Sequence, residues 1–318
     1  MIMKKYTIFV SGASGIVGYG VLKSLRQANS GYLYGATIYN ISPANCFADE
    51  VLIAPPTVSA EYIPWLIETI KSKKIDMIIP TIEIDVEVWN ENRDELEKTG
   101  AVVLLNNEEL IRHCLDKLEF SRILLKEKVR CRIPSYESLS EIQDFGGGYI
   151  VKPKKGFGSR GIFYAKSYDE LKQFEKLIKS THFVQEYVGH ASEEYTVSCF
   201  FNRNSEICAM VALKRKLSKQ GFTEIAESVD SIFFRDTILE LAHVFRPIGP
   251  TNFQFRVHNG QLKLLEINPR ISSSTSIRCL LGYNESKMAV EYFLDEETVI
   301  QPEVRQGKVV RYVEDYLL

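Results

Sequence analysis

The clearest candidates for a functional site in this sequence lie in the segment Glu266-Ile267-Asn268-Pro269-Arg270. Glu266, Asn268 and Arg270 alternate along an extended segment, so their side chains share one face. A carboxylate and an amide oxygen two residues apart form a hard oxygen site that suits Mg²⁺ carrying phosphate ligands. An arginine on the same face can bind a phosphoryl oxygen in a fork. The segment therefore predicts a magnesium–phosphate site, and the alternative is a polar strand end exposed to solvent.

Gln254 lies on the preceding predicted strand and could supply a further oxygen ligand. A two-residue Asn259-Gly260 turn would pair residue 258 with residue 261, which puts Gln254 on the face opposite Glu266. A three-residue loop would instead pair residue 254 with residue 264 and place Gln254 beside Glu266. The metal site therefore predicts that longer loop or a β-bulge. With a plain two-residue turn, the ligand set contracts to Glu266 and Asn268.

A second cluster, residues 152–161, combines basic side chains with glycines. A strand that ends in Lys152-Pro153 fixes one ammonium group, and the glycines let backbone N–H groups approach an anion without interference from side chains. Three lysines and one arginine give the segment a local positive field. No Gly-Lys-Ser/Thr follows, so this is not a Walker loop. We predict phosphate binding here, against the alternative of a solvated basic hairpin tip.

Elements of two kinds must position these clusters. Over about the first 110 residues, apolar strands alternate with helices, which predicts a parallel sheet covered on both faces. Those strands are expected at 6–10, 75–80 and 101–105, and the helices at 62–73 and 86–98. Later strands follow one another with turns between them, which predicts an antiparallel sheet. They are expected at 149–153, 183–188, 195–201, 207–213, 251–257 and 262–267, with helices at 116–128 and 168–180.

A first glycine turn, Gly12 to Gly18, follows the first strand and opens a helix, where a phosphate could bind. A nicotinamide site would also need an acidic residue at the end of the second strand to hold the ribose. The counterpart, residues 36–40, ends without Asp or Glu. We therefore favour glycines that let a strand turn tightly into a closely packed helix. An NAD(P)-dependent oxidoreductase or epimerase is the alternative function that this turn supports.

Composition limits the class of protein. A chain of 318 residues should form two or three compact units. The formal net charge of −2 does not point to nucleic acid or to an anionic membrane. The six cysteines are scattered without a C-x-x-C pair, which fits a reducing compartment better than a zinc site or a disulfide framework. We read no signal peptide and no membrane span, and we expect a cytoplasmic protein.

In their order along the chain, these features resemble the ATP-grasp superfamily, and within it the carbamoyl-phosphate-synthase-like branch of stand-alone carboxylate–amine ligases. The resemblance covers most of the chain and implies an α/β, Rossmann-like pre-ATP-grasp domain at residues 1–113. An α+β ATP-grasp fold with two subdomains would follow. The N-terminal subdomain, residues 114–189, would carry the glycine lid, and the C-terminal subdomain, residues 190–318, the metal site.

The resemblance also implies roles for particular residues. Lys117, after Asp116, matches a phosphate-contacting lysine, while Lys152 and Arg270 match the strand lysine and the phosphate-facing arginine, which we take as catalytic. The residues matched to the lid over the phosphates are Gly156, Gly158, Ser159, Arg160 and Gly161. The residues matched to the adenine strand are Gln185, Glu186, Tyr187 and Val188. Glu194 matches the ribose-binding acid. The residues matched to the magnesium ligands are Gln254, Glu266 and Asn268.

In the adenine strand, the resemblance gives Glu186 and Val188 backbone contacts with the base. Many family members carry a carboxylate where this chain has Gln254, although the branch tolerates glutamine, and this softens the prediction of two full-strength metal sites. The segment Lys214-Arg215-Lys216, with the loop at 220–223, resembles a substrate-proximal strand and loop to which we assign no single role.

The implied activity is a two-step ligation. ATP would phosphorylate a small-molecule carboxylate to an acyl phosphate, and an amine or ammonia would then displace phosphate. The implied cofactor is Mg²⁺, with Mn²⁺ as a substitute. The implied partners are small-molecule substrates, without nucleic acid or membrane, and a homodimer is left open beside a monomer. A second alternative function is an ATP-binding regulator that keeps the fold but has lost turnover.

Overall fold

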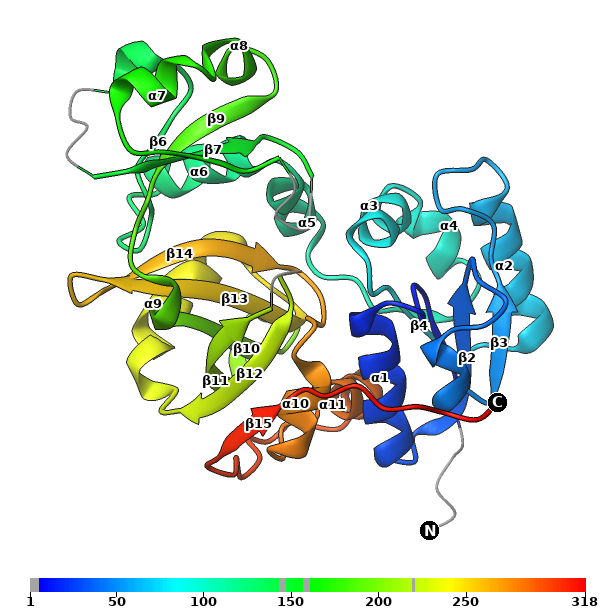
Figure 1. Cartoon of the computed structure of the whole chain (residues 1–318). Helices are drawn as coiled ribbons and strands as arrows, with labels where there is room; N and C mark the ends of the chain where they lie inside the picture. The colour runs from blue at the N-terminus through cyan, green and yellow to red at the C-terminus, as the bar shows by residue number, and fades with distance from the viewer. Residues whose placement is uncertain (1–5, 143–146, 157–160, 219–220) are drawn as a thin grey trace.

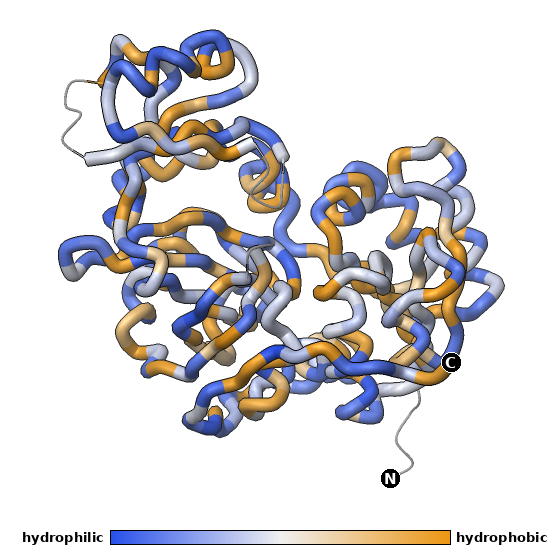
Figure 2. The backbone as a smooth tube through the Cα atoms, viewed as in Figure 1, coloured by the Kyte–Doolittle hydropathy of each residue, from blue (hydrophilic) through white to orange (hydrophobic). Residues whose placement is uncertain are grey.

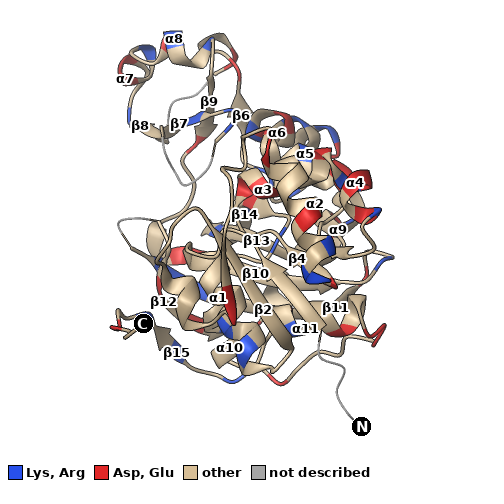
Figure 3. Cartoon of the chain, turned by 90° about the vertical axis from the view of Figure 1, so that its right-hand side faces the viewer, with Lys and Arg blue, Asp and Glu red and all other residues tan. Residues whose placement is uncertain are grey.

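The structure is a computed structural model that describes residues 6–142, 147–156, 161–218 and 221–318. It contains three sheets (Figure 1). The N-terminal sheet forms one side of the molecule, a six-stranded sheet forms the other, and a four-stranded sheet lies above the six-stranded one. Basic and acidic side chains are mixed over the elements (Figure 3). No helix in the described ranges is long and apolar enough to cross a membrane.

The N-terminal sheet has five parallel strands in the order β3-β2-β1-β4-β5, as the alternation of strands and helices predicts. Its strands are β1 (Tyr6–Val10), β2 (Gly31–Thr37), β3 (Glu50–Ile53), β4 (Met77–Ile79) and β5 (Val102–Val103). The helices are α1 (Ile16–Gln27), η1 (Pro43–Cys46), α2 (Tyr62–Lys73), α3 (Glu83–Glu91) and α4 (Arg93–Glu97). The predicted helix at 86–98 is thus divided at Asn92. Because all five strands run in one direction, the turns after β1 and β4 meet at one edge.

The first glycine turn is packed too tightly for larger residues. A Cβ atom on Gly18 would lie 2.6 Å from Ala13 Cα and nearer still to the Gly12 carbonyl oxygen. Gly12 itself has φ +55° and would meet the Thr81 and Ile82 side chains at 2.9 Å. Strand β2 ends at Thr37, and residues 31–40 contain neither Asp nor Glu. These contacts give the glycines a packing role.

Replacing Gly18 with Ala should therefore destabilise the fold, although alanine is the better helix former. Overpacking against fixed backbone atoms costs about 3 kcal/mol, which exceeds the gain of about 1 kcal/mol from helix propensity. We expect the thermal unfolding midpoint to fall by roughly 5 °C. Gly147→Ala is the control, because a Cβ there meets nothing within 4 Å. Equal midpoints for the two variants would contradict the packing role.

The four-stranded sheet is antiparallel, in the order β6-β9-β7-β8. Its strands are β6 (Ser135–Tyr136), β7 (Tyr149–Pro153), β8 (Phe163–Ala165) and β9 (His182–Glu186). A 3-10 helix, η2 (Leu139–Glu141), lies between β6 and β7 in the chain. The helix predicted at 168–180 is divided into two short helices, α7 (Tyr168–Lys172) and α8 (Glu175–Ile178). The break lies at Phe174, whose ring stacks on Phe163 with 4.9 Å between centroids. Packing against the sheet interrupts the helix there.

The six-stranded sheet is also antiparallel, in the order β14-β13-β10-β11-β12-β15. Its strands are β10 (Glu194–Phe201), β11 (Ile207–Leu217), β12 (Thr223–Val229), β13 (Gly249–His258), β14 (Gln261–Asn268) and β15 (Lys308–Val310). The tip of the β13–β14 hairpin is hydrophilic (Figure 2). Sequence analysis placed strands alone after residue 190, but the structure adds η3 (Ala191–Glu193), α9 (Ile232–Phe245), α10 (Thr275–Leu280) and α11 (Glu285–Phe293).

One hydrophobic core joins the N-terminal sheet to the six-stranded sheet. It contains Val21 and Leu22 of α1 together with Leu213 of β11 and Tyr283 before α11. Gly20 allows α1 to approach α10, since a Cβ there would lie 3.1 Å from Thr275 Cγ2. The loop between β14 and α10 is therefore held between two units of the fold.

One of the two expected domain boundaries falls within a helix, and the other falls in a connection between elements. The boundary near residue 113 lies inside α5 (Glu108–Leu115), which is followed directly by α6 (Lys117–Lys126). The boundary near residue 190 lies between β9 and η3. The three sheets themselves occupy residues 6–103, 135–186 and 194–310.

Candidate functional site

A cavity of about 420 Å³ opens where the three sheets face one another. Its wall draws on β7 and β9 of the four-stranded sheet, on β10, β11, β13 and β14 of the six-stranded sheet, and on α1 and α3 of the N-terminal unit. Nine of the predicted site residues line it: Lys117, Lys152, Gly156, Gln185, Glu194, Gln254, Glu266, Asn268 and Arg270. Residues from positions 117 to 270 are thus brought to one cavity.

The β13–β14 hairpin resolves the position of Gln254. Its turn is a two-residue Asn259-Gly260 turn, with φ of +50° and +73° and with His258 paired to Gln261. The structure therefore takes the second of the two predicted arrangements, a β-bulge, and not the three-residue loop. A β-bulge lies farther along, where Phe255 pairs with Leu264 and Gln254 pairs with Glu266. The extra residue shifts the register by one, so Gln254 lies beside Glu266 even though the turn is short.

The Glu266 carboxylate accepts hydrogen bonds from both neighbouring amides. Gln254 Nε2 lies 2.5 Å and Asn268 Nδ2 3.0 Å from Glu266 Oε1. The oxygen of the Gln254 amide accepts a hydrogen bond from Arg215. Gln254 and Asn268 would both have to rotate their amides to present oxygen on the Glu266 side, because each now directs its nitrogen toward that carboxylate.

These residues fit Mg²⁺ bound together with phosphate groups. The described residues contain no group of three or more His, Cys, Asp and Glu side chains that could hold a metal ion. A dedicated protein cage is therefore missing from that part of the chain, whereas one carboxylate with one or two amide oxygens matches the sparse protein ligation of Mg²⁺ on nucleotides.

Glu194 joins two arginines in the cavity wall. Its Oε1 accepts a hydrogen bond from Arg215 Nη2 at 2.8 Å, and its Oε2 accepts from Arg256 Nη2 at 2.9 Å and Nε at 3.1 Å. Glu194 pairs with Arg256 across β10 and β13, which explains the fork geometry. Glu194 is 4% exposed. A contact with ribose hydroxyls would have to use its remaining lone pairs.

Two lysines reach the cavity from the four-stranded side. Lys117 is the first residue of α6, which Asp116 caps through its carboxylate, and the Lys117 ammonium donates to the Gly156 carbonyl. Lys152 Nζ lies 2.6 Å from Gln185 Oε1 on the neighbouring strand β9. The pKa of Lys152 is lowered to about 8, mainly by burial; the Glu266 carboxylate acts in the opposite direction, and the positive charge of Lys117 adds to the lowering.

Arg270 is held by the N-terminal unit. It is paired with Glu83, the first residue of α3, and its Nη1 donates to the Ile271 carbonyl at 2.8 Å. Its side chain is 9% exposed, while that of Glu83 is 39% exposed. A guanidinium at this position faces the cavity from the side of the β4–α3 turn.

The predicted lid and adenine strand are partly described. Gly156 and Gly161 have φ of +124° and +70°, a region that favours glycine. Gly158, Ser159 and Arg160 lie outside the described residues.

In the adenine strand, Glu186 N donates to Pro134 O at 3.1 Å and Tyr187 N donates to Gly148 O at 2.9 Å. Val188 is 4% exposed, and no described residue accepts a hydrogen bond from its N–H. A buried, unpaired donor of this kind suits a ligand acceptor.

Sequence reasoning gave no role to three charged residues of the cavity wall. Glu83 follows a parallel strand at its carboxyl end, and that position was the available signal. Arg256 lies two residues from Gln254 on β13 and therefore shares its face. Arg215 was placed near a substrate, but its contacts with Glu194 and Gln254 depend on tertiary packing.

Family models match two parts of the chain. Residues 179–316 match the model described as "ATP-grasp in the biosynthetic pathway with Ter operon". Residues 17–104 match the model described as "PylC-like, N-terminal domain".

Curated relatives are carbamoyl phosphate synthase large chains. The protein of Methanothermobacter thermautotrophicus is 25% identical over 86% of this chain, and that of Pyrococcus furiosus is 23% identical over 88%. This chain spans 28% of the first relative and 29% of the second.

Solved structures share the fold at low identity. N5-carboxyaminoimidazole synthetase from Staphylococcus aureus, complexed with ADP, has a TM-score of 0.75 at 17% identity, covering 95% of this chain and 81% of that one. The biotin carboxylase domain of Hydrogenobacter thermophilus 2-oxoglutarate carboxylase, in complex with MgADP, ADP and bicarbonate, has a TM-score of 0.72 at 12% identity, covering 96% and 74%. These comparisons do not favour a nicotinamide-dependent enzyme. The two family models thus identify an ATP-grasp segment at residues 179–316 behind a PylC-like N-terminal segment at residues 17–104, and the solved structures share the fold of almost the whole chain.

Proposed function

We propose that the protein is an ATP-dependent ligase that activates a small-molecule carboxylate as an acyl phosphate and joins it to an amine or ammonia, releasing ADP and phosphate. One observation carries the proposal. Glu266 and its two amide neighbours share a single cavity with Lys117, Lys152 and Arg270. A carboxylate–amide shelf surrounded by cations is suited to a polyphosphate.

The nucleotide would lie between the four- and six-stranded sheets. The Val188 N–H and the Glu186 carbonyl would contact the base, and Glu194 the ribose. Lys117 and Lys152 would bind phosphate oxygens, as would the lid glycines. Gln185 supports this arrangement because it holds the Lys152 ammonium in place. Mg²⁺, for which Mn²⁺ could substitute, would be held by Glu266 and, after rotation of their amides, by Asn268 and Gln254, and would neutralise phosphate charge.

In the first step, a carboxylate oxygen of the substrate attacks the γ-phosphorus, and the bond to the β,γ-bridging oxygen breaks, so that ADP leaves. In the second, the amine nitrogen attacks the acyl carbon, the bond to the phosphate oxygen breaks, and the amine loses a proton. No nucleophilic side chain is needed. Positioning and charge stabilisation by Lys152, Arg270 and Lys117 supply most of the rate.

We further propose a cytoplasmic location, where six free thiols such as those of this chain stay reduced. Burial raises the pKa of Cys131 to about 12 and also raises the pKa of Cys114, so these thiols are not nucleophiles. We expect small-molecule partners and a homodimer, which light scattering on purified protein would test.

A screen of carboxylate and amine pairs tests the ligase. Phosphate release is measured with Mg-ATP and each carboxylate, first with hydroxylamine, which traps an acyl phosphate as a hydroxamate, and then with amines, the products being identified by mass. At least one carboxylate should stimulate release and yield a hydroxamate. Tight ATP binding without turnover across the panel would favour the regulator, and binding of NAD near Gly12 would favour the oxidoreductase.

A further inference from the structure

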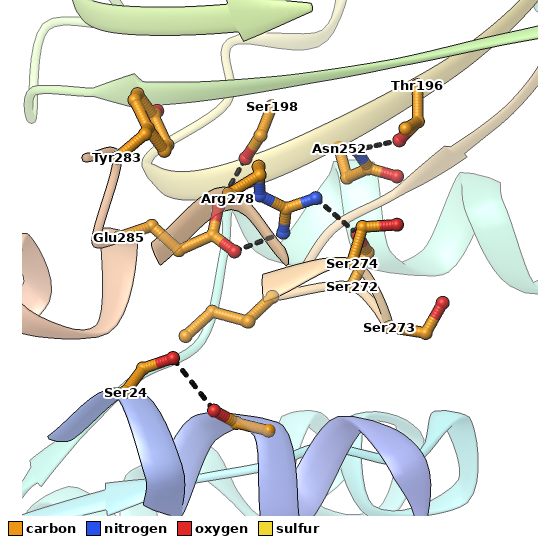
Figure 4. A network of polar contacts seen from close by, with 12 residues as sticks. Ser24, Thr196, Ser198, Asn252, Ser272, Ser273, Ser274, Arg278, Tyr283 and Glu285 are labelled. Carbon is orange, nitrogen blue, oxygen red and sulfur yellow. Dashed lines mark hydrogen bonds and ion pairs between the residues drawn. The ribbon is translucent and has the colours of Figure 1, made fainter. Parts of the chain in front are cut away.

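A buried ion pair lies behind the loop that follows Arg270. Arg278 of α10 and Glu285 of α11 are each 1% exposed and are joined through Arg278 Nη2 and Glu285 Oε1 (Figure 4). The Ser198 hydroxyl of β10 donates to the other oxygen of Glu285. Burying such a pair costs desolvation energy that the attraction seldom exceeds by much, so stability alone is a weak reason for its presence.

The pair also contacts the cavity wall, through Ser272. Arg278 Nη1 donates to Ser272 Oγ at 3.1 Å (Figure 4). Arginine has donors and no acceptor, so it occupies a lone pair of the Ser272 oxygen and leaves the hydroxyl proton for another partner. No described residue accepts that proton, and Ser272 lines the cavity two residues after Arg270. Its hydroxyl is therefore a donor that can point into the cavity.

The loop that carries Ser272 is fixed from several sides. The Ser272 carbonyl accepts a hydrogen bond from Thr275 N at 3.0 Å, and the Ser273 carbonyl accepts one from Arg311 Nη2 at 2.8 Å. Ile271 is buried in the core shared with α1. Ser272 thus lines the cavity from a loop that packs on the N-terminal unit. A donor held this firmly is preorganised for an anionic oxygen.

We propose that Ser272 donates a hydrogen bond to an oxygen of the carboxylate substrate, and that Arg278 and Glu285 are positioning residues that fix its hydroxyl. This inference rests on the ligase function proposed above. Glu285 holds one arm of the guanidinium, and the other arm holds Ser272. The orientation of a cavity donor is thereby set by residues that never touch the substrate.

Ser272→Ala tests the donor, using the carboxylate that best stimulates phosphate release in the wild type. Its KM for that carboxylate should rise about tenfold, the loss typical of one hydrogen bond to a charged group, while KM for ATP stays within about twofold. Ser274→Ala is the matched control. Ser274 is buried on the same loop, but its hydroxyl pairs with Thr223 Oγ1 at 3.0 Å and does not line the cavity. Its kinetics should match the wild type.

Arg278→Lys tests the positioning role. A single ammonium can keep the contact with Glu285 but cannot also reach Ser272 as the fork does. The expected result is a carboxylate KM raised as in Ser272→Ala, with no further rise when both changes are combined. The joint replacement Arg278→Met with Glu285→Leu, which removes the pair without leaving a buried charge, should behave likewise and serves if Arg278→Lys does not fold.

The outcomes separate cleanly. An unchanged carboxylate KM in Ser272→Ala, or a rise in KM for ATP instead, overturns the inference while the ligase function stands. A normal KM in folded variants at position 278 overturns the positioning role. A wild-type protein that turns over no carboxylate refutes the proposed function, and the inference with it.

Discussion

Glu266→Gln should still bind ATP but lose phosphate release by on the order of a thousandfold. Glutamine has the same shape and can keep an oxygen toward Asn268, so the β13–β14 hairpin should remain intact. What it removes is the one negative charge among the three proposed magnesium ligands, Gln254, Glu266 and Asn268. Without that charge, phosphate oxygens must hold the ion with amides alone, and the charge that develops on the transferred phosphoryl group is less well neutralised.

Carboxylate-stimulated phosphate release, measured over a range of Mg²⁺ concentrations, checks this result. Glu227→Gln is the control, because Glu227 lies on the same sheet but pairs with Lys308 at 3.1 Å in a half-exposed ion pair. Such pairs contribute little, so activity should stay within about twofold. A Glu266→Gln enzyme that keeps more than about a tenth of the wild-type rate would remove Glu266 from the ligand set.

The parts of the fold that sequence predicted are those governed by local periodicity. Apolar runs such as β1 and β4 are buried on both faces, and their alternation with α2 and α3 predicted the parallel sheet correctly. The helices α9 to α11 were missed. α9 is apolar around much of its circumference, so its pattern lacks the contrast between faces that marks an amphipathic helix.

The register of the β13–β14 hairpin shows where sequence reasoning reached its limit. Turn chemistry at Asn259-Gly260 predicted the short turn, and chemistry at Glu266 demanded another register. The turn is short and Gln254 still lies beside Glu266, because Leu265 is the extra residue of the bulge. Two adjacent leucines, Leu264 and Leu265, break the alternation expected of a strand with one buried face, and this was the available signal.

Long-range pairs could not be predicted from spacing. Arg270 and Glu83 are 187 positions apart and meet because the N-terminal unit packs on the grasp through α1 and α10. The contact of Arg278 with Ser272 is short in sequence, but its meaning depends on the burial of Glu285 beneath β10. The groups proposed to bind a nucleotide were thus found from local motifs, whereas the residues proposed to select the other substrate are positioned by tertiary packing.

Above pH 8, the protein should take up a proton when it binds ATP. Lys152 should be the group that makes the affinity for ATP depend on pH. Burial lowers the pKa of the free Lys152 ammonium to about 8. Phosphate oxygens favour the charged form and raise that pKa again in the complex. Below pH 8 the ammonium is already charged, and affinity should be constant. As pH rises through 8, binding must first restore the proton, so the dissociation constant for ATP should increase about tenfold by pH 9.

Calorimetry in two buffers of different ionisation enthalpy measures that proton directly, and an uptake near one is expected at pH 9. Lys152→Arg is the matched variant, since guanidinium keeps its charge throughout this range. Lys152→Arg should show no proton uptake, and its dissociation constant for ATP should not change with pH. Lys152→Met should bind ATP about a hundredfold more weakly than the wild type at neutral pH. Equal uptake in the wild type and Lys152→Arg would assign the proton to another group. Absence of uptake in both would mean that Lys152 does not face the phosphates, because a buried ammonium next to a polyphosphate cannot keep a pKa near 8.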